Sequence, residues 1–370
     1  MLGAQLARAC GLALQVAREH DVAGVERVRL IEADASDSSS ARAAVASLAA
    51  DGCRAIVGSE LSDVALAAAD AAHAAGLLFW ELEAIADELT AEARRGIFRF
   101  NCDASSFGAT PVDFVAELVA PALGRDPRSL RVGIVHEDTA YGRSTAGGMR
   151  RRATALALDV RVAQAVAPGA DATPAIARCA RERVEVLLSS GYSDHAIATH
   201  RAVRDMNVPL LAFVGAGAGY NTERFADAAG PDAASVYVTG NAPAAALDEG
   251  RLAPAARELL ARYRTLAAAA GMPSRDADLE LAFQGTLLLL EGVIGQAPDP
   301  SLDALDAASR AIDVAEGGTI DGFGVRFDER GQNARARPAL MRRVAGELRA
   351  VFPAAFASAS LAAAEAQGVG

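Results

Sequence analysis

The sequence of 370 residues contains no lysine, and all 36 of its basic residues are arginines. Schiff-base enzymes need a lysine amine, and P-loop and protein-kinase sites need a lysine beside the phosphates of the nucleotide. The chain therefore lacks an essential group of three large enzyme classes. Its formal net charge of −11 also argues against a nucleic-acid partner, because a phosphate backbone requires a basic surface.

Long apolar runs and closely spaced cysteines are absent as well. No window approaches the ~18 consecutive apolar residues of a membrane span. The four cysteines form no C-x-x-C motif, which argues against a zinc site or a thioredoxin-type redox site. We expect buried thiols, with a disulfide between two of them left open. These cysteines are Cys10, Cys53, Cys102 and Cys179.

The first residues, Met1-Leu2-Gly3, lead directly into a helical pattern. The charged and apolar regions of a signal peptide are not found there. Three interpretations stay open: the mature protein begins here, the start codon is misplaced, or the protein remains inside the cell.

Short apolar segments alternate with helical patterns over most of the chain, which favours parallel sheets covered on both faces. The length and the 52% of hydrophobic residues suit two globular α/β domains. Three helices and a β-rich tail follow, at 254–270, 278–294, 302–314 and 322–344. The predicted strands span 27–33, 55–57, 77–80, 97–100, 132–136, 160–165, 184–189, 209–214 and 235–239.

Three candidate catalytic or cofactor motifs fail on spacing. The glycines of 215–219 follow a late strand and do not match the G-x-G-x-x-G of a dinucleotide site. Ser193, Asp194 and His195 are adjacent, so their side chains cannot converge as a catalytic triad. His195 and His200 are five residues apart, which does not place them on one helix face as metal ligands. No cofactor or metal is expected.

Two carboxylates, Glu81 and Glu83, follow the predicted strand 77–80. Open parallel sheets bind ligands at the carboxyl ends of their strands, so this loop is well placed. The pair fits acid–base catalysis, recognition of a ligand's cationic group, or an ordinary solvated loop.

Other polar residues occupy comparable loops. Ser62 stands near the start of a predicted helix, where a hydroxyl and free N–H groups suit a ligand carboxylate. Tyr141, Tyr192 and Tyr220 each follow a predicted strand, and the chain has only five tyrosines. Tyrosine offers an apolar wall with a polar tip, so the three together favour a ligand site.

An ordered set of short strings resembles the type I periplasmic binding proteins of the leucine/isoleucine/valine-binding group. The resemblance covers nearly the whole chain, although no single string is decisive. The strings are ADASD at 33–37, AIVG at 55–58 with Ser62, DELT at 87–90, FRF at 98–100, EDTAYG at 137–142, VYVT at 236–239 and FDERG at 327–331.

This resemblance implies two Rossmann-like lobes with parallel sheets, joined by crossings near Asp103, Gly240 and Phe323. Lobe 1 would hold residues 1–103 and 241–322, and lobe 2 residues 104–240 and 323–370. A small polar ligand would bind in the cleft as the lobes close. The expected partner is a membrane ABC permease, and the expected form is a monomer in the periplasm or anchored at the cell surface.

Residue by residue, the resemblance gives Ser62 the ligand carboxylate and places Tyr141 and Tyr192 over the ligand. The family's acidic partner for an ammonium group aligns with Gly217. We hypothesise that Glu81 or Glu83 replaces it, with Trp80 shaping the pocket. If neither does, the ligand is a carboxylate or another polar metabolite.

The family also begins with a central strand that this sequence lacks, so we expect an unpaired gap in the first sheet that lowers its stability. Two alternative functions stay open. One is a cytoplasmic sensor on the same lobes, and the other is an enzyme that uses Glu81 and Glu83.

Overall fold

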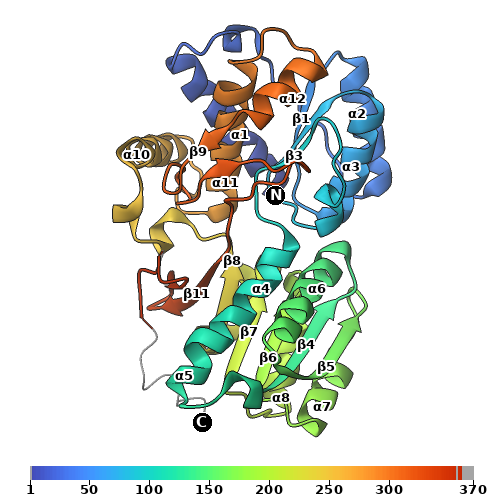
Figure 1. Cartoon of the computed structure of the whole chain (residues 1–370), viewed down its shortest axis with the longest axis vertical. Helices are drawn as coiled ribbons and strands as arrows, with labels where there is room; N and C mark the ends of the chain where they lie inside the picture. Colours follow the sequence, from blue (N-terminus) through green and yellow to red (C-terminus); the bar gives the residue numbers. More distant parts are fainter. Residues whose placement is uncertain (1, 356, 361–370) are drawn as a thin grey trace. The chain divides into compact units, whose positions relative to one another are not determined.

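The computed structural model describes residues 2–355 and 357–360, which fall into two compact units (Figure 1). Unit 1 comprises Met1–Asp103 and Glu249–Arg337, and unit 2 comprises Ala104–Asp248 and Pro338–Gly370. Each unit is therefore assembled from two stretches that are distant in sequence.

The chain passes from one unit to the other after Asp103, after Asp248 and after Arg337. The segment after Gly240 stays with unit 2, where Arg349 donates a hydrogen bond to the carbonyl of Ala245. The segment after Phe323 stays with unit 1, because Gln332 and its neighbours bond to the end of the third strand.

Unit 1 has helices on a small parallel sheet. The sheet order is β1-β2-β3, with Ala55 of β1 opposite Leu78 of β2 and Phe79 of β2 opposite Ile97 of β3. An apolar core of alanine, valine, leucine and phenylalanine side chains packs α2 and α3 on this sheet. Its elements are α1 (Leu2–Glu19), α2 (Ser38–Ala50), β1 (Ala55–Gly58), α3 (Ser62–Ala74), β2 (Leu78–Glu81), β3 (Ile97–Arg99), α10 (Pro254–Ala269), α11 (Ala277–Leu288), α12 (Leu302–Arg310), β9 (Asp313–Val314) and β10 (Val325–Arg326).

The predicted strand 27–33 is wrong. Residues 28–35 form no helix and pair with no strand in the described part of the chain. β1 has β2 on one side only, so it forms the edge of the sheet. A strand exists only through its hydrogen-bonded neighbour, and the segment from Val28 to Ile31 has none in the described residues. The sequence pattern identified the residues that suit a strand, but not the missing partner.

Unit 2 has a larger sheet in the order β12-β11-β8-β7-β6-β4-β5, parallel from β8 to β5 and antiparallel at β11 and β12. Two buried apolar clusters cover its faces, as predicted for parallel strands. Its elements are α4 (Ala104–Phe114), α5 (Ala120–Ala122), β4 (Arg131–Glu137), α6 (Ala140–Ala155), β5 (Asp159–Val166), α7 (Thr173–Arg181), β6 (Val186–Ser190), α8 (Ser193–Asp205), β7 (Ala212–Ala216), α9 (Glu223–Ala229), β8 (Val236–Gly240), β11 (Ala339–Val344) and β12 (Glu347–Phe352).

Helices α4 and α6 pack side by side on one face of this sheet (Figure 1). Glycines allow the two backbones to approach closely. A Cβ atom added to Gly148 of α6 would lie 2.6 Å from the carbonyl oxygen of Ser105, which belongs to α4. The neighbouring Gly147 faces only the flexible side chain of Arg151. The contact between the helices therefore depends on Gly148 and not on Gly147.

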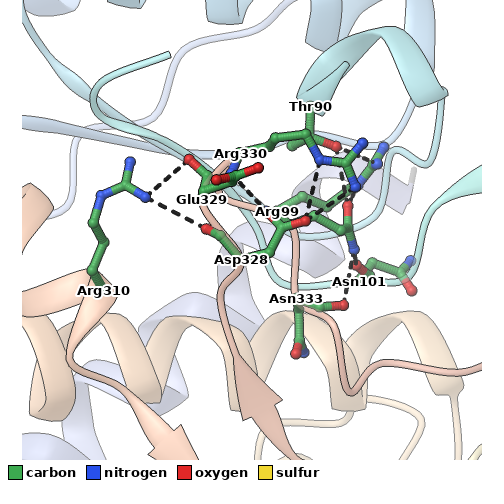
Figure 2. Close-up of polar contacts among 9 residues, drawn as sticks. Thr90, Arg99, Asn101, Arg310, Asp328, Glu329, Arg330 and Asn333 are labelled. Carbon is green, nitrogen blue, oxygen red and sulfur yellow. Dashed lines mark hydrogen bonds and ion pairs between the residues drawn. The ribbon is translucent and has the colours of Figure 1, made fainter. Parts of the chain in front are cut away.

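A buried polar network joins the two stretches of unit 1 (Figure 2). The guanidinium of Arg99 is fully buried and donates to Gln332 Oε1 at 2.6 Å, to Ala86 O at 2.6 Å and to Thr90 Oγ1 at 2.7 Å. Asn333 donates to the carbonyl of Phe100 at 2.9 Å. Burial lowers the pKa of Arg99, although nearby carboxylates oppose this shift. The FRF string thus meets Gln332 and Asn333, which directly follow the FDERG string, through neutral oxygen acceptors.

All four cysteines lie among the described residues, and each is a free thiol. Within the same residues, no helix combines the length and the apolar character that a membrane crossing needs.

Candidate functional site

Ser62 is the first residue of α3 and is buried. The capping position before it is Leu61, whose side chain makes no cap hydrogen bond. Leu61 therefore does not cap the first helical turn, and a helix N-terminus favours a negative charge. The Ser62 hydroxyl accepts a hydrogen bond from Ala86 N–H at 3.2 Å, which places it against the loop that follows β2.

Glu81 is the last residue of β2, and its carboxylate is fully buried. Its Oε1 accepts from the N–H groups of Ser59 at 2.7 Å, Glu83 at 2.9 Å and Ala84 at 2.8 Å. Burial raises its pKa to about 7, and these donors oppose the rise. The structure thus uses this carboxylate to join the loops after β1 and β2.

Glu83 differs from Glu81, since its Oε1 is buried without a hydrogen-bond partner among the described residues. Burial raises its pKa well above the usual range, and the charges of Asp278, Glu81, Asp276 and Glu60 raise it further. A carboxylate in this setting gains stability from any cation that approaches it. No local signal marks Asp276 and Asp278 as site residues, because they begin α11 and are distant in sequence from β2.

The pH dependence of unit 1 should reflect this acidic group. Burial and the nearby Asp276 and Glu60 raise the pKa of Asp278 from 3.8 to about 7. The folded state therefore binds the proton more tightly than the unfolded state, so stability is full below about pH 4 and falls as the pH rises toward 7. We expect urea unfolding to show this decline in the native protein and a smaller decline in Asp278→Asn. Equal slopes for the two proteins would contradict the assignment.

Trp80 lies in the core of unit 1 and is fully buried. Its indole N–H donates to Gly285 O at 3.0 Å, and its ring contacts those of Phe98 and Phe327 with centroids 6.1 and 5.2 Å away. Successive side chains of a strand point to opposite faces, so Trp80 and Glu81 cannot face the same space. Trp80 anchors β2 beneath the loop that carries Glu83.

Two tyrosines meet in unit 2, at the carboxyl ends of its parallel strands. Tyr141, in the first turn of α6, donates its hydroxyl proton to Ala216 O at 2.6 Å and is buried. The ring of Tyr192, which precedes α8, lies 5.2 Å from it. A Cβ on Gly217, where the backbone has a φ of +66°, would overlap the Tyr141 hydroxyl. Gly217 thus provides the space that Tyr141 occupies.

The backbone N–H of Tyr192 donates to Glu137 Oε2 at 3.0 Å. Glu137 ends β4 and is buried, which raises its pKa. Glu137 is the first residue of the EDTAYG string, but nothing in the local sequence indicates that it fixes the loop after β6. It positions Tyr192 beside Tyr141.

Tyr220 is fully buried, and its hydrogen bond and ring contacts involve residues other than Tyr141 and Tyr192. Its hydroxyl donates to Ser189 Oγ at 2.7 Å, and its ring contacts Phe213 and Phe225. His195 belongs to the same buried network, with Nε2 at 3.3 Å from Ser189 Oγ, and burial lowers its pKa to about 4. Tyr220 therefore supports the loop after β7 from within the core.

The structure thus brings the predicted residues together in two sets. Unit 1 holds Ser62 at the start of α3 and Glu83 in the loop after β2, with Trp80 and Glu81 of β2 supporting that loop. Unit 2 holds Tyr141, Tyr192 and Gly217, with Tyr220 beneath. Within the described residues, no group of three or more histidine, cysteine or acidic side chains is arranged to hold a metal ion.

Comparison with known proteins gives the class to which this arrangement belongs. The sequence profile of the periplasmic binding protein family matches residues 1–347, so the chain is a member of that family. The predicted type I periplasmic binding protein fold, with two α/β lobes, is confirmed by solved structures of the same architecture.

Within this family, the chain is similar to several individual binding proteins. The chain is 28% identical over 358 residues to the Leu/Ile/Val-binding protein homolog 8 of Brucella abortus, covering 95% of this chain and 87% of that protein. It superposes with a TM-score of 0.75, at 18% identity, on the substrate-binding protein LivJ of Streptococcus pneumoniae in complex with isoleucine, covering 95% and 94% of the two chains. A solute-binding protein of R. palustris in complex with benzoate gives a TM-score of 0.71 at 19% identity, covering 97% and 94%.

Proposed function

We propose that this chain is the solute-binding protein of an ABC importer and captures an amino acid or a related carboxylate as its two units close. Family membership and the similarity to the Leu/Ile/Val-binding homolog support solute capture. Isoleucine and benzoate, which two structural neighbours bind, share a carboxylate group. Capture followed by closure needs only binding groups, and no catalytic step is part of the proposal.

The observation that carries the proposal is that Ser62, at the start of α3, bonds to Ala86 in the loop after β2, and that the same loop carries Glu83. The first turn of α3, which Leu61 does not cap, would supply N–H donors for a carboxylate, and the Ser62 hydroxyl would add another. Glu83 supplies the opposite charge, because its Oε1 is buried without a partner among the described residues. An ammonium next to Glu83 would neutralise a carboxylate that is otherwise costly to ionise.

The residues of unit 2 would complete the enclosure. Tyr141 and Tyr192 present aromatic surface at the strand ends, and Gly217 leaves room for them. Glu81, Trp80 and Tyr220 act as positioning residues, since their side chains are saturated within their own units. We further propose delivery to a membrane permease by a monomer located in the periplasm or at the cell surface.

A thermal-shift screen with amino acids and with aromatic acids such as benzoate tests this function. A ligand at 100 times its Kd stabilises the native state by about 2.7 kcal/mol, which should raise the unfolding midpoint by several degrees. Glu83→Gln should abolish the shift with amino acids but retain any shift with benzoate, which has no ammonium group. Glu92→Gln, at an exposed position, serves as the matched control.

Two outcomes would contradict the proposal at different levels. An amino-acid shift that survives in Glu83→Gln would remove Glu83 as the cation partner and leave solute binding in place. A cooperative melt with no shift from any compound would contradict solute binding itself.

A further inference from the structure

Two acidic segments of unit 1 meet at the carboxyl end of β2. Glu83 belongs to the loop that follows this strand, whereas Asp276 and Asp278 are at the start of α11. Burial raises the pKa of Glu83 well above its usual range, and the charges of Asp278, Glu81 and Asp276 raise it further, which shows that these groups are neighbours. The loop with Glu83 therefore faces more negative charge than its own.

Packing of β2 against α11 holds the two segments together. The indole N–H of Trp80 donates to the carbonyl of Gly285 at 3.0 Å. A Cβ atom added to Gly285 would lie 2.5 Å from Cδ2 of Leu82, the residue before Glu83. Asp278 precedes Gly285 by about two helical turns, so it lies on the same face of α11, near the start of the helix. The acidic start of α11 thus faces the loop that carries Glu83.

Two of the four acids already have partners in the backbone. Glu81 accepts hydrogen bonds from the N–H groups of its own loop and of Ser59. Asp276 caps α11, where its Oδ1 accepts from the N–H groups of Asp278 at 3.0 Å and Leu279 at 3.1 Å. A helix N-terminus stabilises such a carboxylate without any cation. Glu81 and Asp276 are therefore satisfied within unit 1.

Glu83 and Asp278 differ, because neither side chain is balanced within the described residues. Oε1 of Glu83 is buried there without a hydrogen-bond partner. The half-buried carboxylate of Asp278 takes part in no hydrogen bond or ion pair of the described residues, although the chain has 36 arginines. Burial, Asp276 and Glu60 raise its pKa to about 7, and no arginine opposes them. Both carboxylates would gain from positive charge.

The arrangement suits separated positive charges better than a metal ion. Within the part of the chain that the structure describes, no three histidine, cysteine or acidic side chains converge to hold a metal. Glu83 and Asp278 instead belong to different segments, a loop and a helix start. One ammonium group would balance Glu83 and leave Asp278 without a partner, which is costly for a carboxylate removed from water.

We propose that the solute is an amino acid with a cationic side chain, such as arginine or lysine. Its carboxylate would lie at Ser62 and the first turn of α3, its ammonium at Glu83, and its side-chain cation at Asp278. This inference rests on the proposed function, because it assigns the class of solute to the same site. Complementary charge of this kind selects among ligands of equal size.

Calorimetric titration with two matched pairs of compounds tests the assignment. Citrulline has the shape of arginine without its charge, and norleucine lacks only the side-chain ammonium of lysine. At least one pair should favour its cationic member by about tenfold or more, since a buried charge pair has an effect of this size or greater. In Asp278→Asn the preference should fall below about threefold, because the charge partner is gone. Glu92→Gln, at an exposed position, should keep it.

The outcomes separate this inference from the proposed function. Neutral members that bind as tightly as cationic ones would overturn it, as would a preference that survives in Asp278→Asn. Binding of leucine or benzoate without binding of arginine or lysine would also overturn it and leave solute binding in place. A native protein that binds none of these compounds would contradict both. A cooperative melt of Asp278→Asn confirms that the variant is folded.

Discussion

Replacing Arg99 with alanine should lower the free energy of unfolding by about 3–5 kcal/mol. The side chain is fully buried, and its loss leaves three acceptors without their donor, on Gln332, Ala86 and Thr90. It also leaves a cavity where the largest buried polar side chain of unit 1 had packed. Urea unfolding measures the loss, and native-state hydrogen exchange should assign it to unit 1.

Arg330 provides the matched control for this prediction. It lies two residues from Gln332, and its ion pair with Asp328 is solvent-exposed. Exposed pairs contribute about 0–1 kcal/mol, so Arg330→Ala should change the stability by less than that. A loss below 1 kcal/mol for Arg99→Ala would mean that the network contributes little, and that the two stretches of unit 1 are held by apolar packing.

A second large effect is expected at the contact between α4 and α6 in unit 2. Gly148→Ala adds a methyl group where the backbone of Ser105 already lies 2.6 Å from the Cβ position. Because backbone cannot turn aside as a side chain can, the helices must move apart, at a cost of about 1–3 kcal/mol. Thermal or urea unfolding of the purified variant measures this cost.

The adjacent Gly147→Ala should behave in the opposite way. Its Cβ meets only the end of Arg151, which is flexible. Alanine favours a helix over glycine by about 0.5–1 kcal/mol, so this variant should be slightly more stable than the native protein. If both variants destabilise equally, helix separation is not the cause of the loss at Gly148.

The sequence predicted the order of strands and helices because that order is encoded locally. Helix α2, for example, starts at a capping box formed by Asp37 and Ser40, and β6 begins with the apolar run 186–188. The strand expected at 27–33 failed for the opposite reason, since pairing depends on a neighbour elsewhere in the chain. Local pattern can identify residues that suit a strand but cannot supply the partner.

The candidate site was predictable only in part. Ser62, Glu83, Tyr141 and Tyr192 follow strands, and the rule that strand ends carry ligand sites finds them directly. The same rule also selected Glu81, but its carboxylate accepts hydrogen bonds from backbone N–H groups of its own unit. That difference depends on how two loops fold against each other, which spacing does not reveal. Whether these residues contact a ligand stays a prediction.

The discontinuous construction of unit 1 has a consequence for synthesis on the ribosome. Arg99 and its acceptor Gln332 are separated by 233 positions. At ~5–20 residues per second, roughly 10–50 s pass between the emergence of the two side chains. During that interval the first stretch of unit 1 lacks the helices and the acceptor that complete it, whereas most of unit 2 is already available to fold. Residues made late in synthesis, Glu249–Arg337, therefore complete the unit that synthesis began first, and a nascent chain that stops before Gln332 should depend on chaperones.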